Sequence, residues 1–231
     1  MGAIQALMER RIVPEIISGT SVGALAGAFL ADGYKPEEIL DIFSHKSLRE
    51  FAGFSISHAG LCNTTQIFDF LKKNIRAKNF EDLHIPLYIT ATDFENGVSY
   101  DFHEGPLLAP IVASCSIPIL FNATIINGKQ YVDGGLLKNL PASVIRDKCT
   151  EIIGINLNPI HLDKNKDSIK GIAEKSLHCI FNSNTGADKI LCDILIKPKN
   201  IRKYSMFEME HSKTIYDIGY KAASNYFDNR L

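Results

Sequence analysis

The stretch Gly19-Thr20-Ser21-Val22-Gly23 joins an apolar segment to a segment of small residues. Residues 12–17 are rich in β-branched side chains, which favours a strand, and residues 24–31 are mainly alanine and leucine, which is compatible with a helix. A serine in the pattern G-x-S-x-G between a strand and a helix is typical of a nucleophile elbow, a sharp turn that exposes the hydroxyl. We therefore interpret Ser21 as a nucleophile, with Gly19 and Gly23 permitting the turn and leaving space for a substrate. A purely structural glycine turn is the alternative interpretation.

The composition indicates one globular domain over residues 1–231, with 45% hydrophobic and 22% charged residues and no linker-like segment. A net charge of −1 provides no argument for nucleic-acid binding. The five cysteines are widely spaced and form no C-x-x-C pair, which favours reduced thiols over disulfides or a zinc site. We expect a cytoplasmic protein, because no apolar run reaches the ~18 residues of a transmembrane helix and no signal peptide is evident.

Strand and helix patterns alternate along the chain, which predicts a layered α/β fold with a mostly parallel central sheet. Asn96-Gly97 and Asn127-Gly128 each lie between two β-rich runs and predict hairpins. Residues 51–61 are uncharged and rich in glycine, and they fit either a loop on the core or an apolar wall of an acyl-binding site. Helices are expected over residues 1–11, 36–45, 64–75, 107–114, 141–148, 169–182 and 207–227, and strands over 12–17, 86–93, 98–102, 123–126, 130–132, 152–157 and 190–196.

A serine hydroxyl needs a base to accept its proton. Asp133 is a candidate because it follows an alternating strand and precedes two glycines, so that its carboxylate is expected at a strand end beside an open backbone. An ordinary Asp-Gly turn is the alternative. The histidines stand in unremarkable surroundings and are weaker candidates: His45, His58, His84, His103, His161, His178 and His211. No ligand spacing indicates a metal site.

Three stretches, in this order, resemble the bacterial patatin-like phospholipases: PEIISGTSVGA (residues 14–24), ASCSIPILF (113–121) and YVDGGLLKNLP (131–141). The resemblance implies a layered αβα fold, a Ser–Asp dyad without histidine or cofactor, and hydrolysis of acyl esters of phospholipids or related lipids, with a membrane surface as a possible partner. It assigns Ser21 as nucleophile and Asp133 as proton acceptor. Gly19, Val22, Gly23, Gly134 and Gly135 then support the motifs and the oxyanion.

In that family a strand and a glycine-rich oxyanion loop precede the helix that residues 1–7 match. We therefore expect the natural chain to begin upstream. Ile117, Ile119, Leu120 and Phe121 are candidates to hold an acyl tail, with plain core packing as the alternative. An esterase with a Ser–Asp–His triad and a catalytically impaired or non-catalytic protein of the same fold remain competing hypotheses. Head group, chain length, regiospecificity and oligomeric state are left open.

Overall fold

The computed structural model describes residues 1–44, 54–57, 60–62, 64–157, 169–199, 201, 204 and 210–229. The helices are α1 (Gly2–Glu9), α2 (Val22–Ala31), α3 (Pro36–Ser44), α5 (Thr65–Asn74), α6 (Leu108–Ser114), α7 (Ile169–Ser183), α8 (Gly186–Ile190) and α9 (Ser212–Asp228). The strands are β1 (Ile17–Thr20), β2 (Phe54–Ser57), β3 (Gly60–Cys62), β4 (Leu87–Asp93), β5 (Val98–Phe102), β6 (Thr124–Ile126), β7 (Lys129–Asp133), β8 (Ile153–Ile155) and β9 (Ile194–Ile196). Short 3₁₀ turns are η1 (Phe80–Asp82), η2 (Gly134–Leu136), η3 (Ala142–Val144) and η4 (Arg146–Lys148).

The central sheet is mixed and has the order β1-β4-β7-β6, with β5 also paired to β4. Strands β1 and β4 are parallel, as are β8 and β9 in a separate pair. The two predicted Asn-Gly hairpins are confirmed, and they add the antiparallel pairs β4–β5 and β6–β7. In the second hairpin both Asn127 and Gly128 have positive φ, as a tight two-residue turn requires.

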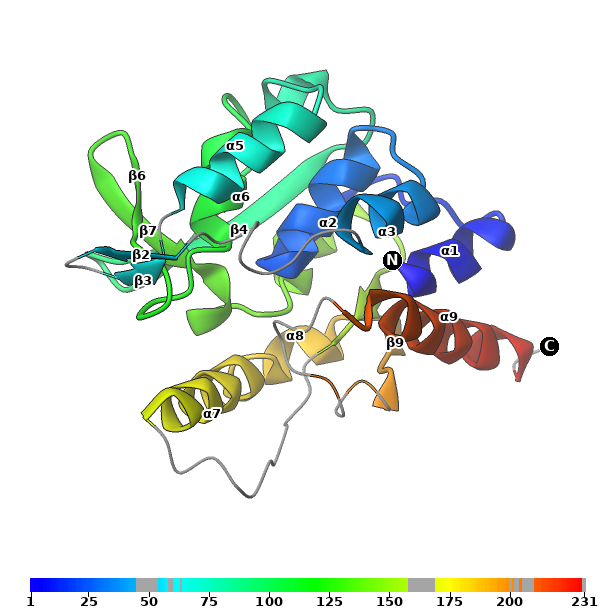
Figure 1. The fold of residues 1–231 in the computed structure, drawn as a ribbon. Coiled ribbons are helices and arrows are strands. Elements are labelled where there is room, and N and C mark those ends of the chain that lie inside the picture. The colour runs from blue at the N-terminus through cyan, green and yellow to red at the C-terminus, as the bar shows by residue number, and fades with distance from the viewer. Residues whose placement is uncertain are drawn as a thin grey trace.

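Elements pack on both faces of the sheet, so the expected layered α/β fold class is confirmed. The expected mostly parallel sheet is not found among the described strands, since β1–β4 is parallel but β4–β5, β4–β7 and β6–β7 are antiparallel. Figure 1 shows α2 and α5 beside β4, and Leu177 and Phe181 of α7 join the same core. Tyr88, on the opposite face of β4, packs instead against Ala142 and Ile145 of the η3–η4 segment.

The main core lies between α2, α5, α6 and β4, where Phe29, Leu71, Ile89 and Ile111 are each completely buried. These apolar contacts hold α2, and therefore its first turn, firmly against the sheet.

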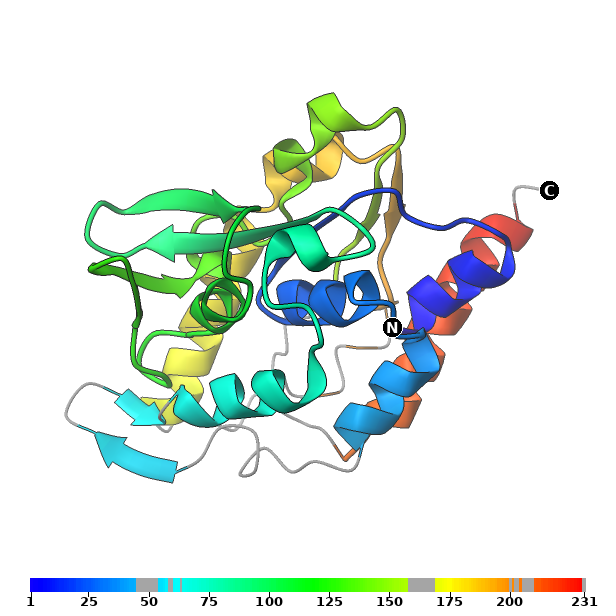
Figure 2. The ribbon, with the colours of Figure 1, turned by 90° about the horizontal axis from the view of Figure 1, so that it is seen from above.

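Helices α1 and α9 lie side by side, although they are near opposite ends of the chain (Figure 2). A Cβ at Gly2 would lie 1.8 Å from the Tyr216 carbonyl oxygen, and one at Gly219 would lie 3.2 Å from the Ala3 nitrogen. Small residues at both positions therefore allow the two helix backbones to approach closely.

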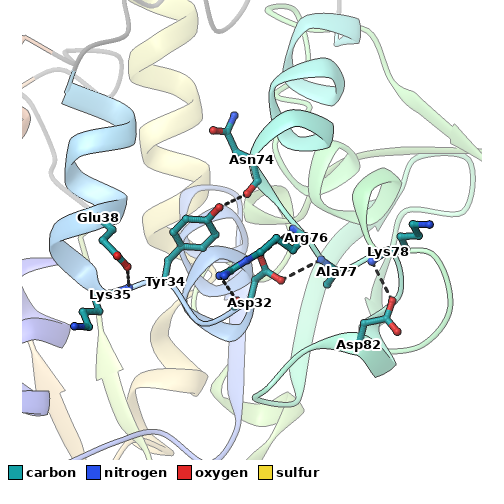
Figure 3. Close-up of polar contacts among 9 residues, drawn as sticks. All are labelled: Asp32, Tyr34, Lys35, Glu38, Asn74, Arg76, Ala77, Lys78 and Asp82. Atoms are coloured by element: carbon teal, nitrogen blue, oxygen red, sulfur yellow. Dashed lines mark hydrogen bonds and ion pairs between the residues drawn. The ribbon is translucent and has the colours of Figure 1, made fainter.

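A buried carboxylate fixes the end of α2. The Asp32 carboxylate accepts hydrogen bonds from the backbone N–H groups of Arg76 at 2.9 Å and Ala77 at 3.0 Å, and from Arg76 Nε at 3.2 Å (Figure 3). The Arg76 guanidinium also lies over the Tyr34 ring, 4.5 Å from its centroid. A cavity of about 330 Å³ opens beside this cluster, next to Lys78 and His84. Because the surrounding donors satisfy the Asp32 carboxylate, we interpret the cluster as structural.

Several predicted boundaries are wrong. The first strand is Ile17–Thr20 rather than residues 12–17, because Pro14 provides no N–H for strand pairing and the strand instead extends through Gly19 into the turn. The helix predicted over 141–148 consists of two 3₁₀ turns, η3 and η4. The strand predicted over 190–196 is only Ile194–Ile196 and follows the short helix α8.

The glycine-rich segment 51–61 contains a short hairpin rather than only a loop, since β2 pairs antiparallel with β3. Its remaining residues, and residues 207–209 of the predicted last helix, lie outside the described residues. In the described part of the chain, no helix is long and apolar enough to cross a membrane.

Candidate active site

Strand β4 brings the ends of β1 and β7 together. Strand β5 occupies one edge of β4, so β1 and β7 both pair along its other edge. In these ladders Thr20 is the partner of Thr90, and Asp133 is the partner of the next residue, Ala91. Because β1 runs parallel to β4 and β7 runs antiparallel, the two carboxyl ends meet at neighbouring positions. Ser21, which directly follows Thr20, therefore lies next to Asp133.

Ser21 occupies a strained backbone conformation at the start of α2, with φ 54° and ψ −120°. A positive φ is unfavourable for a residue with a Cβ and is typical of a serine in a nucleophile elbow. A Cβ at Gly19 would lie 2.5 Å from the backbone carbon and oxygen of Gly23, so the turn requires glycine at position 19. A Cβ at Gly23 would meet no atom within 4 Å, and so position 23 borders open space.

Asp133 is completely buried and is held through its backbone and one carboxylate oxygen. Its N–H donates to the Ser116 carbonyl at 2.9 Å, and its Oδ1 accepts from the Gly135 N–H at 2.7 Å. A Cβ at Gly134 would lie 2.3 Å from the Thr90 carbonyl oxygen, so the turn after Asp133 can pack against β4 only with glycine there. Within the described part of the chain, the Asp133 Oδ2 atom has no hydrogen-bond partner.

Burial raises the pKa of the Asp133 carboxyl to about 7, because the charged form loses its hydration. The Ser21 side chain and the Gly135 N–H oppose this rise as hydrogen-bond donors. Thus Ser21 lies close enough to affect the pKa of the carboxyl, although no described group donates a hydrogen bond to Asp133 Oδ2. A carboxylate with a pKa near neutrality is a stronger base than an exposed aspartate and is still partly ionised at pH 7.

Sequence reasoning missed one polar residue at the turn. The Ser21 N–H donates to Ser114 Oγ at 2.8 Å, and Ser114 Oγ in turn donates to the Thr90 carbonyl at 2.7 Å. Ser114 lies in the second matching stretch, residues 113–121, but nothing in that stretch indicates a contact with Ser21. Only the packing of α6 against β4 reveals it.

The four candidate acyl contacts lie in different environments. Ile117 and Phe121 are buried in the main core, and Leu120 packs against it, so all three fit the alternative of core packing. Ile119 is 63% exposed and has a φ of 75°, which is unusual for a β-branched residue. Val22, directly after Ser21, is 56% exposed. Ile119 is therefore the most exposed of the four candidate acyl contacts.

Among the described residues, no histidine contributes to the pKa shift of Asp133, whose causes are burial, Ser21 and Gly135. His103 stacks on Tyr88 with ring centroids 4.9 Å apart, and His84 borders the cavity near Asp32. His178 is buried on α7, and His211 precedes α9. His45, His58 and His161 lie outside the residues whose side chains are described.

Where side chains are described, no group of three or more His, Cys, Asp or Glu residues is arranged to hold a metal ion. The arrangement of Ser21 and Asp133 is suited to nucleophilic attack by the serine, with the aspartate as proton acceptor. The first turn of α2 adds backbone N–H groups that favour developing negative charge.

Comparison with known proteins identifies the family. A family model described as patatin-like phospholipase matches residues 1–145. An uncharacterised NTE family protein of Mycobacterium tuberculosis H37Rv is 32% identical over 193 residues, which cover 80% of this chain and 52% of that protein. Protein YqhO of Bacillus subtilis is 27% identical over 207 residues, covering 75% and 71%. Lysophospholipase NTE1 of Kluyveromyces lactis is 27% identical over 164 residues, covering 66% and 11%.

The chain spans about half the length of its mycobacterial relatives. The family match over residues 1–145 includes both Ser21 and Asp133, and it extends across the whole central sheet. The chain belongs to the patatin-like phospholipase family.

Proposed function

We propose that this protein is a serine lipid acyl hydrolase in which Ser21 attacks the substrate and Asp133 accepts the serine proton. Membership of the patatin-like phospholipase family supports hydrolysis of lipid esters at the level of the family. The assignment of these two residues is supported mainly by how β1 and β7 pair with β4. Thr20, which precedes Ser21, pairs with Thr90, and Asp133 pairs with the next residue, Ala91.

The proposed reaction has two steps. As Ser21 Oγ attacks the ester carbonyl, its proton passes to Asp133 and the carbonyl oxygen becomes an oxyanion. The N-terminus of α2, including the Val22 N–H, supports that charge. Collapse of the tetrahedral intermediate expels the alcohol or lysolipid, which takes the proton from Asp133. Water then attacks the acyl-enzyme while Asp133 accepts its proton. As the bond between the acyl carbon and Ser21 Oγ breaks, Asp133 returns that proton to Oγ, which releases the fatty acid and restores the free serine and the carboxylate.

Two features make this aspartate suitable as a base. Its raised pKa makes the carboxylate basic enough to accept a proton near neutral pH. No described group donates a hydrogen bond to its Oδ2, so that oxygen is available to receive the proton. The Gly135 N–H on Oδ1 holds the carboxylate in place during both steps.

We propose a phospholipid or lysophospholipid as the substrate, presented at a membrane surface. One relative carries the name lysophospholipase, which supports this class. We further propose that residues 1–231 form one domain and that the protein acts in the cytoplasm. Cys115, Cys149, Cys179 and Cys192 are all free thiols, which fits a reducing compartment.

The test is hydrolysis of p-nitrophenyl butyrate and of a lysophospholipid by the full-length protein, compared with Ser21→Ala and Asp133→Ala. We expect both variants to lose activity by at least ~1,000-fold, because each removes a reacting group. Retention of near-full activity by Asp133→Ala would overturn the dyad. Loss of activity in single histidine variants but not in Asp133→Ala would favour a triad esterase instead.

A further inference from the structure

Ser114 is a buried hydroxyl that connects the nucleophile turn to the sheet. It is the last residue of α6, and none of its surface is exposed. Its Oγ accepts the Ser21 N–H at 2.8 Å and donates to the Thr90 carbonyl at 2.7 Å. The hydroxyl thus donates one hydrogen bond and accepts one, and both bonds lie where the end of β1 meets β4.

The bond to the Ser21 N–H is important because of the strain in the turn. With φ at 54°, the Ser21 backbone lies outside the favoured regions, and surrounding contacts must hold it there. The N–H direction determines the orientation of the peptide plane and thus where the Ser21 side chain points. Donation to Thr90 polarises the Ser114 hydroxyl and strengthens it as an acceptor for Ser21.

The segment from Ser114 to Ser116 also holds the backbone of Asp133, the proposed base. Two residues beyond Ser114, the Ser116 carbonyl accepts the Asp133 N–H at 2.9 Å. The C-terminal end of α6 therefore contacts the backbone of both Ser21 and Asp133. Ile111 and Val112 anchor α6 in the main core, so this contact point is rigid.

We propose that Ser114 is a positioning residue that holds Ser21 in its attacking orientation through the Ser21 backbone N–H. This inference rests on the proposed function, since it requires Ser21 to react. Without the hydroxyl, the Ser21 N–H and the Thr90 carbonyl both lose a partner, and the turn relaxes toward an unstrained backbone. A displacement of about 1 Å at a reacting group costs up to ~100-fold in rate.

The experiment compares Ser114→Ala with Ser114→Thr and with a control, Thr185→Val. Thr185 is equally buried, and its hydroxyl bonds to the Asn182 carbonyl, which is outside the site. Each variant is assayed with p-nitrophenyl butyrate, and Ser21 labelling by a fluorophosphonate probe is timed. Both rates are expressed per folded molecule, measured by circular dichroism at a temperature well below each melting transition.

We expect Ser114→Ala to lower kcat and the Ser21 labelling rate by about 10- to 100-fold while KM stays within about twofold. Ser114→Thr keeps the hydroxyl and is expected to recover part of that loss. Thr185→Val should match the wild-type protein per folded molecule.

Equal kcat values for Ser114→Ala and Thr185→Val would overturn the positioning role while leaving the proposed function intact. A change confined to KM, or no recovery in a folded Ser114→Thr variant, would also overturn it. If the wild-type protein neither hydrolyses the ester nor labels at Ser21, the proposed function fails, and this inference fails with it.

Discussion

Replacing Asp133 by asparagine is expected to abolish hydrolysis and, at neutral pH, to stabilise the fold. The substitution keeps an oxygen that can accept the Gly135 N–H, and it removes a charge that is completely buried. The charged form of this carboxyl is unfavourable in the folded protein, because burial raises its pKa from 3.8 to about 7. The proposed base is therefore a site where activity is retained at the expense of stability.

The magnitude follows from proton linkage. Between pH 4 and pH 7 the folded protein binds a proton at Asp133 that the unfolded chain has released, so the free energy of unfolding decreases as pH rises. With a pKa of about 7 in the folded state, the loss between pH 5 and pH 8 is about 3 kcal/mol. Asparagine does not titrate and escapes this loss. The unpaired Nδ2 group of the asparagine lowers the free energy of unfolding by about 1–3 kcal/mol at every pH. This cost shifts the difference in stability between the variant and the wild type by a constant and leaves its pH dependence unchanged.

The assay is urea unfolding of the wild-type protein and Asp133→Asn, monitored by circular dichroism at pH 5, 6, 7 and 8. We expect the free energy of unfolding of the variant, relative to the wild type, to increase by about 3 kcal/mol from pH 5 to pH 8. A difference that stays constant over this range would show that Asp133 has an ordinary pKa. Asp133 would then be as weak a base as an exposed aspartate.

Three further predictions follow from the same geometry. The kcat/KM of ester hydrolysis should fall about tenfold per pH unit below pH 7, because burial raises the pKa of Asp133 to about 7 and only the ionised carboxyl accepts a proton; a pH–rate profile checks this, and a midpoint near pH 4 contradicts it. Gly19→Ala should destabilise the protein by more than ~2 kcal/mol in denaturant unfolding, whereas Gly23→Ala should change stability by less than ~1 kcal/mol, since only the first Cβ would collide with backbone; equal effects would refute the assigned turn. Asp32→Ala should lower stability by about 2–4 kcal/mol through the lost bonds to Arg76 and the neighbouring N–H, with unchanged kcat, because α2 separates it from Ser21 by about 16 Å; a matching fall in kcat per folded molecule would indicate a role in catalysis.

The features that sequence predicted well are those set by local chemistry. Glycine and asparagine adopt positive φ at low cost, so the Asn-Gly turns predicted both hairpins. The G-x-S-x-G pattern likewise predicted a turn followed by a helix, and α2 begins directly after Ser21. In these places few residues are needed to determine the backbone.

The features that sequence missed depend on packing between distant segments. Residues 141–148 are expected to form a helix, yet they form two separate 3₁₀ turns. The start of this segment is held on β1, where Ser18 Oγ donates to the Pro141 carbonyl at 2.8 Å. Just before it, the Lys138 carbonyl accepts from Thr20 Oγ1 at 2.9 Å. The contact between Ser114 and Ser21 likewise exists only because α6 packs on β4. No spacing rule connects these positions along the chain.

The pairing of Ser21 with Asp133 depends both on local sequence patterns and on the packing of distant segments. Each residue stood out locally, the serine by its elbow and the aspartate by the glycines that follow it. Their proximity, however, follows from the register of β1 and β7 on β4, in which Thr90 and Ala91 are consecutive partners. A shift of one residue in either ladder would change which face of the sheet each side chain occupies.

The most direct test of the central claim is covalent labelling by a fluorophosphonate, followed by mass spectrometry of the modified peptide. Attack by a serine oxygen on phosphorus expels fluoride and marks the residue that acts as the nucleophile. In the wild-type protein at pH 8 we expect one adduct, on Ser21, and a labelling rate at least ~100-fold lower in Asp133→Asn. Labelling of a different serine, or equal labelling of Ser21 in both proteins, would contradict the account.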